Sequence, residues 1–201
     1  MPAQKESKVY QKIVLAAIKV FAEKGIKDTT MEDIAHAIGK GKSTLYYYFP
    51  SKEKIFETVL ETEVTKFIQE LRVAINQGST AKEKLKILAK VQLTAIIRYH
   101  TLEKVMQDEI FDSIRGVENI KISIESTLYQ MVQEIIRGGI QEHIFRNINE
   151  EAIDKISFTT VAIFKGLQLP SYMQAQFNIE SDAYFDTLID LLIDGIGLKK
   201  A

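Results

Sequence analysis

Apolar residues recur three or four positions apart along almost the whole chain. This spacing is typical of amphipathic helices, and three prolines and ten glycines suit a fold of strands and tight turns poorly. The pattern therefore predicts an all-α fold. Outside the segment 29–54, which has its own organisation, the expected helices are 8–24, 51–75, 80–100, 102–115, 117–142, 150–168 and 180–196.

The segment 29–54 begins with a short helix and a glycine-containing turn. Thr30 is expected to cap the helix, with Asp33 three positions later, because a threonine hydroxyl accepts a free backbone N–H at a helix start. Gly39 can take the left-handed conformation that ends a helix. Between them lies a narrow apolar stripe formed by Ile34, Ala35 and Ile38.

A second short helix is expected between Gly41 and Pro50, since the residue before a proline disfavours the helical conformation. Leu45 and Phe49 should point inward, and Tyr48 is the tyrosine most expected to join them. A short helix with hydroxyl and phenol groups on its other faces suits the major groove of DNA, about 12 Å wide. On spacing alone, consecutive tyrosines are as typical of a protein core or a protein–protein interface as they are of DNA contacts.

In this region the chain resembles the TetR family of bacterial transcriptional regulators. The matching pieces are Phe21-Ala22-Glu23-Lys24-Gly25, Thr29-Thr30-Met31-Glu32-Asp33-Ile34-Ala35 and Thr44-Leu45-Tyr46-Tyr47-Tyr48-Phe49-Pro50-Ser51-Lys52-Glu53. The resemblance implies a three-helix DNA-binding domain at 7–67, with its helix-turn-helix at about 30–49, and a helical effector-binding and dimerisation domain at 68–201. It implies DNA contacts at Thr30, Lys42, Ser43, Thr44, Tyr46, Tyr47 and Lys52.

Two positions depart from the family's pattern. Lys40 stands where a small apolar residue is usual, and Gly41 stands where a serine usually caps the recognition helix. A glycine cap is slightly weaker than a serine cap. Lys40 is added to the predicted DNA contacts, because its ammonium could reach a phosphate.

The distribution of charge agrees with a DNA-binding N-terminal part. The whole chain has 26 basic and 27 acidic residues, which alone argues against a nucleic-acid-binding protein. Residues 1–54, however, hold ten lysines and six acidic residues, whereas the remainder is net negative. A positive end on a negative body orients a protein on a polyanion, although chance clustering of surface lysines would give the same count.

The sequence offers little for catalysis, metal binding or a cofactor. His36, His100 and His143 lie in separate helices or turns, and His143 is interpreted as a residue that ends a helix. The run 39–44 imitates part of a phosphate-binding loop but lacks the earlier glycine and a preceding strand. With no cysteine and no signal-peptide or membrane-spanning segment, we expect a cytoplasmic protein that is not an enzyme.

The last two expected helices are apolar on unusually broad faces, and such faces must be buried by something. They could complete the core of a single subunit. The resemblance instead implies a homodimer with a four-helix bundle, which would place two recognition helices on a palindromic operator. The expected interface residues are Ile153, Ile156, Val161, Phe164, Tyr184, Phe185, Leu188 and Leu192.

The resemblance also implies a repressor that a small-molecule effector releases from DNA. The side chains expected to line the effector pocket suggest an apolar or weakly polar effector, although nearly all of them would serve equally as ordinary core residues. Two alternatives stay open: a constitutive DNA-binding regulator without an effector, and a helical carrier of small molecules. The expected pocket residues are Phe67, Leu88, Val91, Thr94, Met106, Ile110, Phe111, Tyr129, Met131, Phe164 and Met173.

Overall fold

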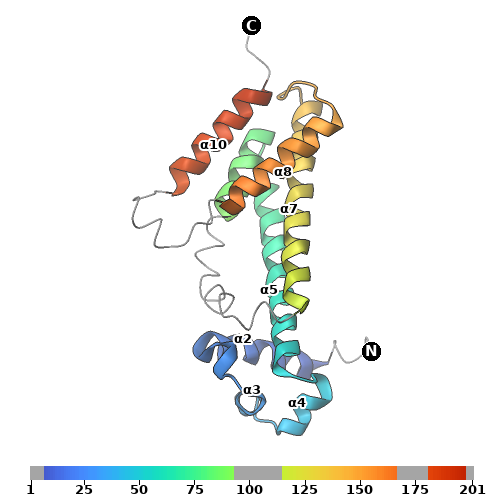
Figure 1. Ribbon diagram of the computed structural model, residues 1–201, viewed down its shortest axis with the longest axis vertical. Helices are drawn as coiled ribbons and strands as arrows, with labels where there is room; N and C mark the ends of the chain where they lie inside the picture. Colours follow the sequence, from blue (N-terminus) through green and yellow to red (C-terminus); the bar gives the residue numbers. More distant parts are fainter. Residues whose placement is uncertain (1–6, 93–114, 167–180, 198–201) are drawn as a thin grey trace. The chain divides into compact units, whose positions relative to one another are not determined.

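The computed structural model describes residues 7–92, 115–166 and 181–197, with the backbone alone at 115–117, 165–166 and 181–185. The fold is all-α, as expected (Figure 1). None of the described helices is both long and apolar enough to cross a membrane. The helices are α2 (Lys8–Asp28), α3 (Met31–Ala37), α4 (Lys42–Tyr48), α5 (Lys52–Ile75), a helix at 81–92, α7 (Arg115–Gln141), α8 (Glu150–Gly166) and α10 (Ser181–Ile196).

The chain divides into two compact units. The first unit comprises Met1–Lys66 and Tyr99–Ile122, and the second comprises Phe67–Arg98 and Ser123–Ala201. The expected helix at 102–115 lies outside the described residues except for its last position. Each unit has its own apolar core, so the two are described in turn.

The core of the first unit is built by the apolar faces of α2, α3, α4 and the first turns of α5. Leu45 and Phe49 are buried in it, as their spacing predicted. Aromatic rings make two of its contacts: Phe21 meets Phe56 edge to face at 5.2 Å between ring centroids, and Tyr10 stacks on Phe49 at 4.8 Å. Its buried residues are Ile13, Val14, Ala17, Val20, Phe21, Ile26, Met31, Ile34, Ala35, Leu45, Phe49, Ile55, Phe56, Val59 and Leu60.

Helix α2 does not end at Gly25, where the sequence predicted its end. Gly25 has φ 77° and ψ 167°, so the helix kinks there and a further turn continues to Asp28. That turn is held because Ile26 is fully buried and the Thr29 hydroxyl donates to the Gly25 carbonyl at 2.6 Å. Gly25 therefore kinks α2, and the chain does not enter a loop at this position.

The second unit packs the later part of α5, the helix at 81–92, α7, α8 and α10 around one core. Lys82 and Lys86 of the helix at 81–92 pair with Asp190 of α10 at 3.2 and 3.1 Å. A backbone bond from Arg146 N–H to the Ile196 carbonyl, 2.8 Å long, holds the end of α10. Large apolar members of this core include Leu71, Leu85, Leu88, Val132, Ile136, Phe145, Ile153, Phe164 and Ile189.

The end of α7 agrees with the predicted helix at 117–142. The helix passes through Gly138 and Gly139 and continues to Gln141. His143, with φ 55°, ends it, which confirms the interpretation of that residue. Gly139 is needed for packing: a Cβ there would meet the Phe145 ring and would lie 2.8 Å from the Ala81 Cβ.

Candidate nucleic-acid interface and apolar cleft

Helix α3 starts with the expected Thr30 cap, and Asp33 makes the cap reciprocal. The Asp33 N–H donates to the Thr30 hydroxyl at 3.2 Å, and the Thr30 N–H donates to the Asp33 carboxylate at 2.8 Å. Lys24 of α2 also pairs with Asp33, at 2.5 Å. The Lys24 ammonium, followed by the Thr30 donors, holds the pKa of the Asp33 carboxyl far below its usual range. The start of α3 is thus fixed at neutral pH by a charged cap.

The turn between α3 and α4 follows the prediction. Gly39 has φ 63°, and the Lys40 N–H donates to the Ala35 carbonyl at 3.0 Å, which closes α3. Gly41 stands at the N-cap of α4 and makes no side-chain cap bond. Lys40 is exposed at the tip of this turn, so its ammonium is accessible from solvent.

Helix α4 rests on Leu45 and presents its polar face outward. Tyr46 and Tyr47 are 49% and 68% exposed. Tyr48 packs partly against the core and meets the Tyr47 ring edge to face at 5.0 Å between centroids. Ser43 is exposed and Thr44 is half-buried. Seven of the predicted DNA contacts therefore lie in the α3–α4 segment, namely Thr30 and the six between Lys40 and Tyr47.

Lys42, the first residue of α4, pairs with Glu32 near the start of α3. Its ammonium also lies 5.8 Å from the centroid of the Tyr46 ring. The bond to Glu32 raises the pKa of Lys42, and the same bond lowers the pKa of Glu32. A phosphate must compete with this carboxylate for Lys42. Sequence reasoning missed Glu32; opposite charges near the starts of two successive helices were the available signal.

Lys52 lies in a different setting from the other predicted DNA contacts. It is the first residue of α5, and its ammonium donates to the backbone carbonyls of Ile26, Lys27 and Thr29. Its contact with DNA stays a prediction. The structure gives its side chain an additional set of partners inside the first unit.

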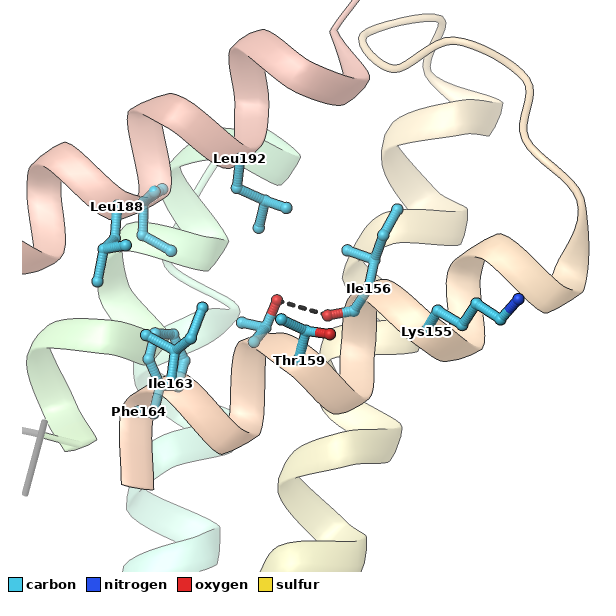
Figure 2. Close-up of a pocket in the computed structure, with 9 residues that line it drawn as sticks. Lys155, Ile156, Thr159, Ile163, Phe164, Leu188 and Leu192 are labelled. Atoms are coloured by element: carbon cyan, nitrogen blue, oxygen red, sulfur yellow. Dashed lines mark hydrogen bonds between the residues drawn. The ribbon is translucent and has the colours of Figure 1, made fainter. Parts of the chain in front are cut away.

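A cleft of about 230 Å³ separates α8 from α10 in the second unit. Figure 2 shows Leu188 and Leu192 projecting from α10 toward α8, where Ile156 and Thr159 lie. The Thr160 hydroxyl donates to the Ile156 carbonyl at 2.8 Å, so it is already satisfied. The cleft is lined by Lys155, Ile156, Thr159, Thr160, Ile163, Phe164, Leu188, Ile189 and Leu192.

Among the predicted effector residues that the structure describes, only Phe164 lines this cleft. Phe67, Leu88, Val91 and Met131 pack in or against the core of the second unit, and the Tyr129 hydroxyl donates to Asp154 at 3.1 Å. Thr94, Met106, Ile110, Phe111 and Met173 lie outside the described residues.

The predicted interface residues divide into buried and accessible sets. Ile153 and Phe164 are covered by their own unit, and Val161 packs against the same core. Ile156, Leu188 and Leu192 line the cleft. The side chains of Tyr184 and Phe185 lie outside the described ones. Phe158 of α8 and Leu191 of α10 were not among the predicted interface residues, yet they are 69% and 64% exposed.

Comparison with known proteins adds a family and two sets of relatives. Residues 13–59 match the family model described as bacterial regulatory proteins, tetR family. The chain is 31% identical over 191 residues to the fatty acid metabolism regulator protein of Bacillus subtilis, covering 94% of this chain and 96% of that one. It is 26% identical over 132 residues to the transcriptional repressor KstR2 of Rhodococcus jostii, with 65% of each chain covered.

The fold has known counterparts. One is the transcriptional regulator FadR of Bacillus subtilis in complex with stearoyl-CoA, with a TM-score of 0.67 at 23% identity, covering 93% of this chain and 99% of that one.

Proposed function

This chain belongs to the TetR family of bacterial regulatory proteins and is a transcriptional regulator, not an enzyme; from that premise we propose that it is a repressor released from its operator by a long-chain acyl thioester. The observation that carries the DNA-binding part is the exposed face of α4. Tyr46 and Tyr47 project from a helix whose other side is anchored by Leu45. Exposed aromatic side chains beside an ammonium favour a polar, anionic partner such as DNA.

The residues of the α3–α4 segment divide by the chemistry of their side chains. Lys40 offers an ammonium to phosphate, which fixes position on DNA without reading sequence. Tyr46, Tyr47 and Ser43 offer groups that can touch base edges or thymine methyls in the major groove. Lys42 can serve either purpose once Glu32 is displaced. We therefore assign sequence selection to α4 and orientation to the surrounding lysines.

A dimer of this chain would use the faces of α8 and α10. Phe158, Ile163 and Leu191 of these two helices are exposed. Ile163 also lines the cleft, together with Leu188 and Leu192. Exposed apolar residues next to an apolar cleft are typical of an interface with a like surface. We propose that a second copy covers them, and that the two copies place their α4 helices on the two halves of a palindromic operator.

The effector proposal rests on the relatives and on two buried polar groups. The amide nitrogen of Gln92 and the hydroxyl of Ser157 are buried without a hydrogen-bond partner in the structure. Such groups are costly unless a partner satisfies them. A ligand with an apolar chain and a carbonyl oxygen would supply both burial and an acceptor, and a relative similar to this chain over almost its whole length is a fatty acid metabolism regulator.

Release would follow if the effector binds one conformation of the regulator better than the other. A coupling of about 1–3 kcal/mol changes DNA affinity by about 5- to 150-fold. The effector need not touch DNA, because only its differential affinity for the two conformations matters.

The deciding experiment is fluorescence anisotropy with DNA flanking the protein's own gene, at low and high salt, with wild type, Tyr46→Ala and Tyr46→Phe. We expect selective, salt-weakened binding that Tyr46→Ala reduces strongly and Tyr46→Phe less, because Phe keeps the ring. If flanking DNA fails, selection from random DNA sequences replaces it. No selective binding in either would contradict the repressor.

The effector is tested on the same complex with stearoyl-CoA, stearate and free CoA. We expect stearoyl-CoA to release DNA and to raise the thermal stability of the free protein. Gln92→Leu should keep DNA binding and weaken this response. If no acyl compound stabilises the protein while selective DNA binding persists, the constitutive regulator is the better description.

A further inference from the structure

Lys52 occupies a helix position that does not favour a cation. It is the first residue of α5, where the helix dipole is positive. Its ammonium instead reaches the end of another helix, and lies 2.8 Å from the Ile26 carbonyl oxygen, 2.9 Å from that of Lys27 and 2.8 Å from that of Thr29. A lysine ammonium has three N–H donors. All three are therefore engaged by backbone within the first unit.

The three acceptors belong to the segment between the kink of α2 and the start of α3. Carbonyls at a helix end have no partner inside the helix, and the negative end of the dipole there attracts a cation. The segment is packed, since the side chains of Ile26 and Thr29 are fully buried. The ammonium thus joins α5 to backbone that lies 23 to 26 positions earlier in the sequence.

This junction lies directly beside the DNA-reading helices. Thr29, whose carbonyl Lys52 binds, precedes Thr30, and Thr30 caps α3. A shift of the Thr29 carbonyl would move that cap, and with it α3 and the turn that leads to α4. Small displacements of this kind matter because base readout depends on the position of a few side chains in the groove.

We propose that Lys52 is a positioning residue, which clamps the α2–α3 junction to α5 and so sets the placement of α3 and α4, and that it does not bind a DNA phosphate. The proposal deepens the proposed DNA-binding function and rests on it. It also departs from the DNA contact that the sequence resemblance implies for Lys52. The two roles differ in one measurable property, because a phosphate contact releases counterions and a clamp inside the protein does not.

Two other lysines provide matched controls. Lys54 stands in the same first turn of α5, but its ammonium pairs with Glu57 at 2.5 Å. Lys40 is exposed in the turn before α4. Methionine replaces each lysine with an uncharged side chain of similar length. Lys52→Arg keeps a cation with several N–H donors and tests whether carbonyl binding can be restored.

The experiment measures operator affinity of the wild type and these variants from about 50 to about 200 mM salt. We expect Lys52→Met to lower affinity about tenfold, by reducing the population of the binding-competent arrangement, while the slope of log affinity against log salt stays that of wild type. Lys52→Arg should recover much of the affinity, and Lys54→Met should retain it. A slope reduced by about 0.9 per subunit in Lys52→Met, as for a lost phosphate contact, would overturn the proposal.

Hydrogen exchange of the DNA-free protein tests the clamp separately from the function. We expect Lys52→Met to speed exchange of the amides that start α3, with α8 unchanged, and Lys54→Met to leave α3 protected. Unchanged protection of α3 in Lys52→Met overturns the clamp. If Lys52→Met does not fold, a folded Lys52→Arg with wild-type α3 protection supports it, and accelerated α3 exchange there opposes it. Should the wild type bind no operator, only the proposed function fails, because the exchange result still decides the clamp.

Discussion

The two units bury similar apolar cores, but α4 of the first unit and helices α8 and α10 of the second expose different kinds of side chain. The first unit exposes Tyr46 and Tyr47, whose rings end in hydroxyls, and the Tyr46 ring lies near Lys42. The second exposes Phe158 and Leu191, which have no polar atoms in their side chains. A tyrosine can satisfy its hydroxyl with water or phosphate. Phenylalanine and leucine side chains are stabilised only by burial against an apolar surface that excludes water.

This difference indicates two kinds of recognition on one chain. The face of α4 is suited to a wet, charged surface that is bound and released. The face of α8 and α10 is suited to a lasting contact with another apolar surface. The exposed residues, more than the buried ones, therefore separate the role of one unit from that of the other.

The sharpest way to break the comparison is to place charge on the apolar face. Phe158→Glu combined with Leu191→Glu should convert a dimer to monomers while each subunit stays helical. Burial of each side chain is worth about 1.5–3 kcal/mol, and a dimer contains two of each, so the loss is at least about 6 kcal/mol. Sedimentation velocity measures the oligomeric state. Leu15→Glu, on an apolar residue of α2 that is 61% exposed, is the control and should remain dimeric. A dimeric double variant would show that this face is not the interface.

The next largest effect concerns the support beneath the tyrosines. Leu45 is fully buried under α4. Leu45→Ala should lower the free energy of unfolding by about 2–5 kcal/mol, because it leaves a cavity, and DNA binding should fall with it. Urea unfolding measures the free energy of unfolding, and fluorescence anisotropy measures DNA binding. Leu15→Ala should change stability by less than about 0.5 kcal/mol. Equal losses of stability in Leu45→Ala and Leu15→Ala would mean that Leu45 does not anchor α4 to the core.

A pair of glycines in α7 tests the packing of the second unit. Gly139→Ala should destabilise by about 1–3 kcal/mol through overpacking against Phe145. Gly138→Ala, where a Cβ meets nothing within 4 Å, should stabilise by roughly 0.5–1 kcal/mol, because alanine favours the helix. Thermal denaturation measures both changes in stability. A change of the same sign in the two variants would contradict the described packing.

The smallest expected effect is on stability at acid pH, and it is tested with one carboxylate from each unit. Lys24 lowers the pKa of Asp33 in the first unit, and Arg137 lowers that of Glu150 in the second. A lowered pKa favours the charged form in the folded state, so each contribution is complete above the ordinary values of 3.8 and 4.5 and is lost as the pH falls through the lowered values.

Thermal denaturation from neutral pH to about pH 3 should therefore show a shallower acid decline for Asp33→Asn than for wild type. Glu150→Gln should show a smaller difference, because Glu150 does not cap a helix in the way that Asp33 does. A decline as steep in Asp33→Asn as in wild type would show that folding does not lower the pKa of Asp33.

The sequence predicts best those features that depend on neighbours along the chain. The Thr30 cap, the left-handed Gly39 and the left-handed His143 each depend on residues within one helical turn. The inward positions of Leu45 and Phe49 follow from helical spacing alone. These preferences act locally, so the rest of the chain does not need to be known.

Features that depend on distant partners could not be predicted. The carbonyls that bind Lys52 are 23 to 26 positions away, and the Glu32–Lys42 pair forms only once α3 and α4 pack. The exposure of Phe158 follows in the same way from which faces of α8 its neighbours cover. Apolar spacing marks a residue as suited to burial, but only the packed fold decides whether it is buried by its own subunit.

The close packing of Gly139 and Phe145 also limits how this protein can evolve. The ring occupies the space that a side chain at 139 would need. A larger residue at 139 therefore becomes tolerable only after residue 145 has become smaller, and the reverse order passes through an unstable intermediate. Relatives with a side chain at the position of 139 are expected to carry a residue smaller than phenylalanine at 145, so the two positions should change together across the family.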